Sequence, residues 1–313
     1  MWLQIRMYLL LGVLFAIVYA VAVALLPGGS LFFYGILASF MLFIQYLIGP
    51  QMVRWSMGVR EVSPQEAPEL HRMVEELSEK AGIRKPKVGV SPRQIPNAFA
   101  YGNFLTGGHV CVTEGILRLL SREELRAVLG HEISHLKNRD VAVITALSVI
   151  PTVMWYVAWS TLWSGGGDRD RGNQAVMGIV AFILYFVTNL LVLYGSRIRE
   201  YYADRGSVEL GNAPHHLATA LYKLVYGSAR APRESLKQME GQRAFFLNDP
   251  SRAVTELREL KEVDLDLSGT IDRDELLALQ SRRIVLSTGE RLMELFSTHP
   301  NMVKRINHLS TLA

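Results

Sequence analysis

The sequence predicts an α-helical membrane protein that also contains a mostly helical α+β domain with a small β-sheet. Three observations favour this fold class. Four long segments lack any charged side chain. The polar segments between them combine an amphipathic helix with short runs of β-forming residues. Hydrophobic residues make up 50% of the 313 residues while charged residues stay at 20%, so the two kinds must be segregated along the chain.

The first two apolar segments form one predicted transmembrane hairpin, residues 1–53. Residues 7–53 contain no Asp, Glu, Lys, Arg or His, and a Pro-Gly-Gly-Ser turn at 27–30 divides them. Each half is long enough for a membrane-spanning helix of about 20 residues. A secretory signal is the competing interpretation of the first half. It fits less well, because the apolar stretch exceeds the ~7–15 residues of a signal core and a second stretch follows at once.

The third and fourth apolar segments form a second predicted hairpin, residues 141–196. The runs 141–167 and 172–196 carry no charge, and the turn between them, at 168–171, reads Asp-Arg-Asp-Arg. This hairpin either spans the membrane or is embedded in it. The alternative is a buried helix pair in a large soluble domain, which charge-free runs of this length disfavour.

Basic residues near the apolar segments predict the orientation. They gather on one side, whereas the opposite side has no charge at 27–30 and alternates arginine with aspartate at 168–171. Because Lys and Arg are enriched on the cytoplasmic side, both polar segments are expected in the cytoplasm of a multi-pass protein of the cell membrane. The basic residues concerned are Arg6, Arg54, Arg60, Lys137, Arg139, Arg197 and Arg199.

The polar segments, 54–140 and 197–313, are predicted to be two parts of one domain. Residues 65–82 have the apolar periodicity of an amphipathic helix that stops at Gly82. Short β-type runs follow at 87–90, 97–101 and 109–113. Ser121 and Glu124 form a capping-box pattern that opens the next helix. Helical periodicity dominates after residue 196.

Composition excludes several classes of protein. The hydrophobic content excludes intrinsic disorder. The net charge of +4 is small, and no basic cluster is interleaved with aromatic residues, so no nucleic-acid partner is expected. The single cysteine, Cys111, excludes an intramolecular disulfide and a cysteine-rich zinc site, and it suits a reducing compartment. A metal in this chain must therefore depend on histidines and carboxylates.

The helix that begins after Ser121 contains an HExxH motif, His131-Glu132-Ile133-Ser134-His135. Histidines at i and i+4 project from one helical face and can share a metal ion. Imidazole nitrogen suits zinc, and the intervening Glu132 is placed to act as general base on a metal-bound water. The motif alone is loose, so a chance match or a surface histidine pair is the alternative.

The context of the motif supports a metal site. Only a few residues separate His135 from the third apolar run, so the HExxH helix is expected to continue into that run. Glu200 follows the fourth run and should return to the same membrane face, which makes it the natural third ligand. Asp204, one turn further on, could hydrogen-bond a ligating histidine. The alternative is that Glu200 is a solvated juxtamembrane charge.

These motifs together resemble the gluzincin membrane peptidases of the HtpX type, relatives of the type I CAAX prenyl proteases. The resemblance covers nearly the whole chain. It includes HExxH followed by Glu200 and Asp204, and it extends to five further stretches: Pro68-Glu69-Leu70-His71, Lys85-Pro86-Lys87-Val88, Pro96-Asn97-Ala98-Phe99-Ala100, Thr298-His299-Pro300 and Arg305-Ile306.

The resemblance implies a zincin-like catalytic domain, with 54–140 as its first part and 197–313 as its second. It implies a zinc endopeptidase with one Zn²⁺ per chain, acting on membrane proteins in quality control and the stress response. It also implies that His299 lies near the active site as a catalytic or substrate-binding residue. Residues 97–101 resemble the active-site edge strand of this family, in which Asn97, Ala98, Phe99 and Ala100 would bind substrate backbone by strand addition. The alternative is an ordinary strand of the sheet.

An acidic loop at 264–275 departs from this family pattern and resembles an EF-hand calcium loop. Positions one, three and nine are aspartate, Gly269 stands at position six, and glutamate ends the loop. Serine at position five lowers the ligand charge. The alternative is a solvated acidic turn between helices. The candidate calcium ligands are Asp264, Asp266, Ser268, Thr270, Asp272 and Glu275.

The sequence therefore predicts an integral membrane zinc endopeptidase that cleaves membrane proteins or peptides at the cytoplasmic face of the lipid bilayer. A CAAX-type prenyl-protein protease is the alternative within the enzyme class. It fits less well, because that type is expected to have seven spans and only four apolar segments are present. A non-proteolytic metal-binding membrane scaffold is the alternative outside it, and it would require a lost base or a broken ligand set.

Overall fold

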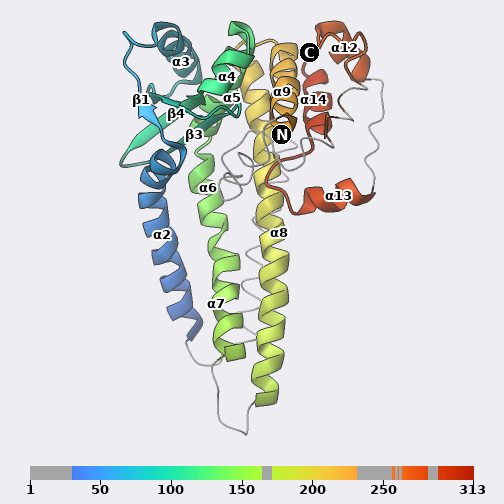
Figure 1. Cartoon of the computed structure of the whole chain (residues 1–313). Helices are drawn as coiled ribbons and strands as arrows, with labels where there is room; N and C mark the ends of the chain where they lie inside the picture. Colours follow the sequence, from blue (N-terminus) through green and yellow to red (C-terminus); the bar gives the residue numbers. More distant parts are fainter. Residues whose placement is uncertain (1–29, 164–170, 231–255, 258–259, 261–262, 281–287) are drawn as a thin grey trace. The chain divides into compact units, whose positions relative to one another are not determined.

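The structure is a computed structural model of the whole chain, and it describes residues 30–163, 171–230, 256–257, 260, 263–280 and 288–313. The chain divides into two compact units. One comprises Met1–Ile48 with Ala142–Ile198, and the other comprises Gly49–Val141 with Arg199–Ala313. The first predicted apolar stretch and the turn at 168–170 lie outside the described residues. The helices and strands of both units are drawn in Figure 1.

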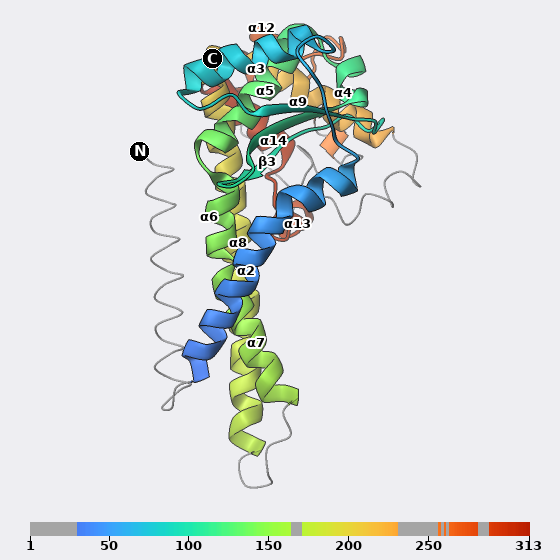
Figure 2. The same ribbon diagram turned by 90° about the vertical axis from the view of Figure 1, so that its left-hand side faces the viewer.

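The first unit is built from long apolar helices. They are α2 (Ser30–Met57), α6 (Asp140–Leu147), α7 (Val149–Trp163) and α8 (Arg171–Glu209), of which α2, α6 and α8 extend into the second unit. Figures 1 and 2 show α7 beside α8, and their contact buries Val153, Met154, Val157 and Ala181. Other apolar side chains of α8, such as Ile179 and Ile183, are exposed, as expected of a surface that faces lipid.

Two helical segments of the described chain are long and apolar enough to cross a membrane. They are Asp140–Trp159, which joins α6 and α7, and Ala175–Glu209 in α8. The first segment begins one residue before the predicted second hairpin, residues 141–196. The second segment begins inside this hairpin and extends beyond its end. The second predicted segment forms the 28-residue helix α2, which is not among these two candidates. The four-span arrangement therefore stays a prediction.

The second unit contains a four-stranded mixed sheet in the order β1-β2-β4-β3. The strands are β1 (Arg60–Glu61), β2 (Lys87–Ser91), β3 (Ala98–Asn103) and β4 (Gly107–Thr113). Strands β2 and β4 are parallel, whereas β1 with β2 and β3 with β4 are antiparallel. The three predicted β-type runs are thus confirmed. Strand β3, which holds three of the four candidate substrate-binding residues, forms one end of the sheet.

Helices surround this sheet. The helices of the second unit are α3 (Pro68–Ala81), α4 (Glu114–Leu119), α5 (Arg122–Lys137), α9 (Pro214–Ala229), α12 (Arg273–Leu279), α13 (Thr288–Leu295) and α14 (Met302–Ser310), together with the end of α8. Helix α5 packs against α3, α9 and β3, and α9 packs against α14. Helix α5 is therefore the central helix of this unit, and the HExxH motif lies in its second half.

Local sequence signals explain where these helices begin and end. Gly82 ends α3 in the left-handed conformation, with φ 68°. The Ser121 hydroxyl accepts the Glu124 N–H and the Glu124 carboxylate accepts the Ser121 N–H, which is the predicted capping box at the start of α5. Leu77, Val112 and Ile133 are fully buried in the main core, where each side chain contributes about 1.5–3 kcal/mol.

The HExxH helix does not continue into the third apolar run, so that expectation was wrong. Helix α5 ends at Lys137, and the Asn138 N–H donates to the Ser134 carbonyl. Arg139 then takes a positive φ of 54°, which no α-helix accommodates. A new helix, α6, begins at Asp140. This break directs the Asp140 carboxylate back toward α5.

Two glycines let α5 and α8 approach closely in the second unit. A Cβ at Gly206 would lie 2.0 Å from Ser134 Oγ and 2.7 Å from Ser134 Cβ, and one at Gly130 would lie 2.8 Å from Ser207 Oγ. The Ser207 hydroxyl also donates to the Ala127 carbonyl over 2.6 Å. The two helices therefore cross at a separation that only glycine permits.

We expect the substitution Gly206→Ala to push α8 away from α5. Overpacking of this kind costs about 1–3 kcal/mol of stability. Because Glu200 lies less than two turns before Gly206, the same change should weaken metal binding. Thermal unfolding and zinc titration of the detergent-solubilised protein measure both effects.

Gly289→Ala is the matched control, because a Cβ at Gly289 meets nothing within 4 Å and alanine favours a helix. A Gly206→Ala protein with unchanged stability and zinc affinity would contradict the role assigned to this crossing.

Candidate metal centre

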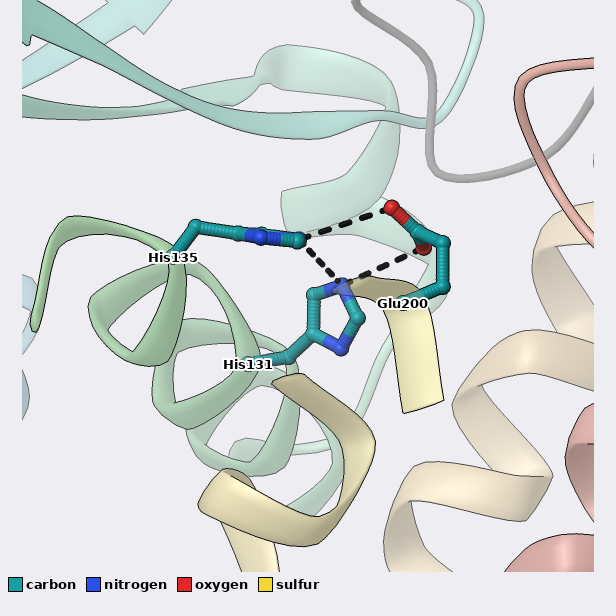
Figure 3. A group of neighbouring side chains, drawn as sticks. All are labelled: His131, His135 and Glu200. Carbon is teal, nitrogen blue, oxygen red and sulfur yellow. Dashed lines mark hydrogen bonds and ion pairs between the residues drawn. The ribbon is translucent and has the colours of Figure 1, made fainter. Parts of the chain in front are cut away.

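Three side chains from two helices converge in the second unit. His131 and His135 project from α5 and Glu200 projects from α8 (Figure 3). The two Nε2 atoms lie 3.0 Å apart. Glu200 Oε2 lies 3.6 Å from His131 Nε2, and Oε1 lies 3.6 Å from His135 Nε2. Ligands about 2.0–2.2 Å from a tetrahedral zinc ion would be about 3.3 Å apart, so these spacings suit one small cation.

The hydrogen bonds of the two imidazoles explain why a cation fits between them. His131 Nδ1 lies 2.9 Å from Asp204 Oδ1, and His135 Nδ1 lies 2.6 Å from Asp140 Oδ2. Because an ionised carboxylate only accepts, each Nδ1 carries the proton. In neutral imidazoles, both Nε2 atoms then present lone pairs to each other and to the Glu200 carboxylate. Three converging electron-pair donors can hold a metal ion.

Arginines hold the outer carboxylates of this cluster. Arg305 on α14 donates through Nε and Nη2 to Asp204, over 2.9 and 2.6 Å, and its Nη1 lies 3.0 Å from Glu200 Oε2. Arg199 pairs with Asp140 and also donates to the Asn138 carbonyl over 2.9 Å. When both imidazoles are neutral, as metal ligands must be, the four carboxylates including Glu132 and the two guanidinium groups leave two net negative charges, which a divalent cation would neutralise.

The two histidines differ in their tendency to take a proton. Burial lowers the pKa of His131, but its contacts with Asp204 and Glu200 outweigh this and raise the pKa to about 9. Burial and the neighbouring His131 lower the pKa of His135 below its usual value. Two imidazolium ions cannot coexist 3.0 Å apart, so the pair holds at most one extra proton.

Glu132 lies between the two histidines in sequence and is fully buried beside them. Its carboxylate accepts a hydrogen bond from the Ala100 backbone N–H of β3. Burial raises the pKa of Glu132 above its usual value. A carboxylate with a raised pKa takes a proton from water more readily than an ordinary one, which suits a general base.

His299 also reaches the cluster. Its Nδ1 lies 3.4 Å from Glu200 Oε1, and the side chain is buried. Neither ring nitrogen makes a hydrogen bond in the described structure. The ring is thus held against Glu200 through Nδ1, and its Nε2 is still available to a further group.

The four candidate substrate-binding residues occupy different environments. Asn97 is fully buried just before β3, and its N–H donates to Thr113 Oγ1. Ala98 belongs to the main core, whereas Phe99 packs into a second cluster. Ala100 is partly exposed and contacts Glu132 through its backbone. The main chain of β3, rather than its side chains, therefore reaches the cluster.

The acidic loop brings three candidate calcium ligands together. Single carboxylate oxygens of Asp264, Asp266 and Glu275 lie within 4.8 Å of one another. Backbone N–H groups already engage them: Asp264 accepts from Ser268 and Gly269, and Glu275 accepts from Leu265.

The remaining loop candidates serve the fold of the loop. Asp272 caps α12 and shares a capping box with Glu275. The Ser268 and Thr270 hydroxyls contact each other at 2.8 Å.

Sequence reasoning missed three residues that support the cluster. No role is predicted for Asp140, Arg305 enters only through the Arg305-Ile306 stretch of the family resemblance, and Arg199 is predicted only as one of the basic residues beside the apolar segments. Asp140 follows His135 by five residues, and Arg305 follows His299 by six, so proximity to predicted site residues was the available signal. Their contacts depend on the break after α5 and on the packing of α14.

A helix with HExxH that meets a distant glutamate is the metal-binding element of metallopeptidases. The comparisons agree with this class. Residues 64–313 match the peptidase family M48, and the chain belongs to that family. It is therefore a metallopeptidase. Together with its relatives and its two apolar helices, this supports a membrane metalloprotease.

Curated relatives named protease HtpX homologues come from several organisms. The homologue of Methanothermobacter thermautotrophicus is 50% identical over 226 residues, covering 71% of this chain and 86% of the relative. That of Moorella thermoacetica is 36% identical over 315 residues, covering 98% and 93%. The recognition of an HtpX-type peptidase from the sequence is thus confirmed.

A solved structure shares the fold. The crystal structure of S. mikatae Ste24p superposes with a TM-score of 0.55 at 16% sequence identity, over 94% of this chain. The chain spans 62% of the length of that protein. At this identity the likeness concerns the fold alone.

We expect Asp140→Ala to weaken metal binding without removing a candidate ligand. His135 would lose the acceptor that fixes its ring, and Arg199 would lose its carboxylate partner. Removing such an outer partner costs about 10–100-fold in metal affinity. Competition with a fluorescent zinc chelator measures it, with Glu123→Ala on the exposed surface of α5 as control. Equal affinities in the two variants would show that Asp140 does not orient His135.

Proposed function

We propose that the chain is an integral membrane zinc endopeptidase that cleaves membrane proteins at the cytoplasmic face. One observation carries the proposal: the lone pairs of His131, His135 and Glu200 converge, and the buried Glu132 carboxylate lies beside them. Two histidines and a glutamate form a three-ligand set that leaves a fourth position open for water or substrate, as in catalytic zinc sites. One Zn²⁺ per chain would be held by these three ligands.

Zinc bound by these residues would polarise the scissile carbonyl and acidify a bound water. The chain supplies the proton transfers. Glu132 takes the proton from the attacking water, and its raised pKa favours this. Glu132 then returns the proton to the leaving amine. His299, beside Glu200, is placed to donate a hydrogen bond to the oxygen on which negative charge develops.

Strand β3 would hold the substrate. It forms the end of the sheet, and the Ala100 N–H contacts Glu132. An extended peptide that adds to a strand edge is held through main-chain hydrogen bonds, so its side chains are read loosely. We assign this role to the stretch Asn97, Ala98, Phe99 and Ala100. The Asn97 N–H and carbonyl are already bonded to Thr113, so Asn97 anchors the start of the strand and the main chain that follows it binds substrate. Loose selection suits a protease of membrane protein quality control and the stress response.

The position of Glu200 supports a membrane substrate. It follows the charge-free run 172–196 by four residues, which is about 6 Å along an α-helix. The basic residues that flank the apolar segments favour the cytoplasmic side for the cluster. Loops or ends of membrane proteins that emerge on that side are the expected substrates.

Two alternatives differ in what they would cleave. A CAAX-type protease would cut a prenylated peptide and spare unmodified membrane proteins. A metal-binding scaffold would cut neither, and it is disfavoured because Glu132 and the three candidate ligands are all present.

We predict that Glu132→Gln keeps zinc but lowers cleavage by ~10²-fold or more, because glutamine cannot accept the proton. The purified full chain is assayed for zinc content and for cleavage of a reconstituted membrane protein, with His135→Ala as the variant that loses zinc. Membrane proteins that accumulate uncut beside Glu132→Gln in cells identify substrates. A Glu132→Gln protein that cleaves at the unmodified rate refutes this mechanism.

Calcium binding by residues 264–275 stays a prediction. We expect calcium to replace backbone N–H groups as the partner of Asp264, Asp266 and Glu275, with Ser268, Thr270 and Asp272 completing the loop. Calorimetric titration of the full chain should give one site that is lost in Glu275→Gln. Absence of heat, and of protection from hydrogen exchange at 263–280, would favour the solvated acidic turn.

A further inference from the structure

Arg305 is a fully buried arginine that contacts two carboxylates of α8 at once. Its Nε and Nη2 atoms donate to Asp204 Oδ2 and Oδ1 over 2.9 and 2.6 Å. Its Nη1 lies 3.0 Å from Glu200 Oε2. The guanidinium is planar and presents several donors in fixed directions, so it fits two carboxylates one helical turn apart in a way that an ammonium group cannot.

These contacts extend to two of the three candidate ligands. Glu200 is contacted directly. His131 is reached through Asp204, because Asp204 Oδ1 accepts from both Arg305 Nη2 and His131 Nδ1. An arginine guanidinium stays protonated in proteins, so a cation lies between these two carboxylates.

The segment that carries Arg305 approaches Glu200 from two sides. His299 lies 3.4 Å from Glu200 Oε1, while Arg305 lies 3.0 Å from Oε2. The stretch between them is fixed, since Asn301 Oδ1 caps α14 by accepting the Val303 N–H and the Asn301 N–H donates to Glu294. Both carboxylate oxygens of Glu200 are therefore contacted from one short segment, residues 299–305.

We propose that Arg305 is a positioning residue that holds Glu200 and Asp204 in the metal-binding geometry, so that the site assembles only when α14 is docked. Helix α14 provides no candidate ligand itself. Arg305 is 101 residues from Asp204 and 174 from His131 in sequence. Zinc binding and the docking of α14 are thus coupled. This inference rests on the proposed zinc site.

The first measurement is zinc affinity, by chelator competition on the detergent-solubilised full chain. Arg305→Met should weaken binding by about 10–100-fold, as loss of an outer partner does. Arg305→Lys should weaken it less, since one carboxylate keeps a cationic partner. Arg122→Met, an exposed arginine paired with Glu69 on the surface, is the control and should bind zinc as the unmodified chain does.

A double-mutant cycle tests whether Arg305 acts through Asp204. In a chain that carries Asp204→Asn, the further change Arg305→Met should cost less zinc affinity than it does alone. Fully additive losses would overturn the coupling. If Arg305→Met fails to fold, the same cycle is run with Arg305→Lys, which keeps the buried positive charge.

Hydrogen exchange gives a readout that is independent of activity. Zinc should increase protection of the α14 amides, residues 302–310, in the unmodified chain but much less in Arg305→Lys. Unchanged exchange in α14 on zinc binding overturns the inference. So does an Arg305→Met protein that binds zinc within twofold of the control. If the unmodified chain itself binds no zinc, the proposed function fails as well.

Discussion

The close crossing of α5 and α8 is the constraint on which the candidate site depends. Gly130 and Gly206 lie where the helices touch, and a Cβ at either position would overlap a serine of the other helix. This crossing sets Glu200 about 3.6 Å from both imidazoles of the HExxH motif. Because the three donors come from only two helices, their geometry follows from how those helices pack.

Electrostatics around the crossing explain why the buried charges are tolerated. Each histidine donates to its own carboxylate, and each of those carboxylates pairs with an arginine. Burying an ionised carboxylate is costly unless it is paired and hydrogen-bonded. The arrangement therefore fixes both imidazole tautomers, leaves the Nε2 lone pairs directed inward, and retains negative charge for a cation. Removing one member of any of these pairs would leave the other member as a buried charge without its partner.

Much of the fold and the centre of the site could be predicted from the sequence. The capping box at Ser121, the stop at Gly82 and the three β-type runs are local signals, and local physics decides them. His131 and His135 follow from helical spacing. Glu200 was singled out because it follows an apolar run, and the structure brings it to both histidines.

The roles of the supporting residues could not be predicted from the sequence, because these roles arise from tertiary packing. Asp140 contacts His135 only because α5 ends at Lys137 and Arg139 takes a positive φ. Arg305 reaches Asp204 only because α14 packs across α9.

X-ray absorption at the zinc edge reports on the ligands of the bound metal itself. We expect one zinc per chain, bound by two imidazole nitrogens at about 2.0–2.1 Å and by carboxylate and water oxygens, without sulfur. The imidazole scattering should disappear together with the zinc in His135→Ala. Zinc that remains bound in that variant, or a spectrum without imidazole scattering, would place the metal elsewhere and contradict the proposed zinc site.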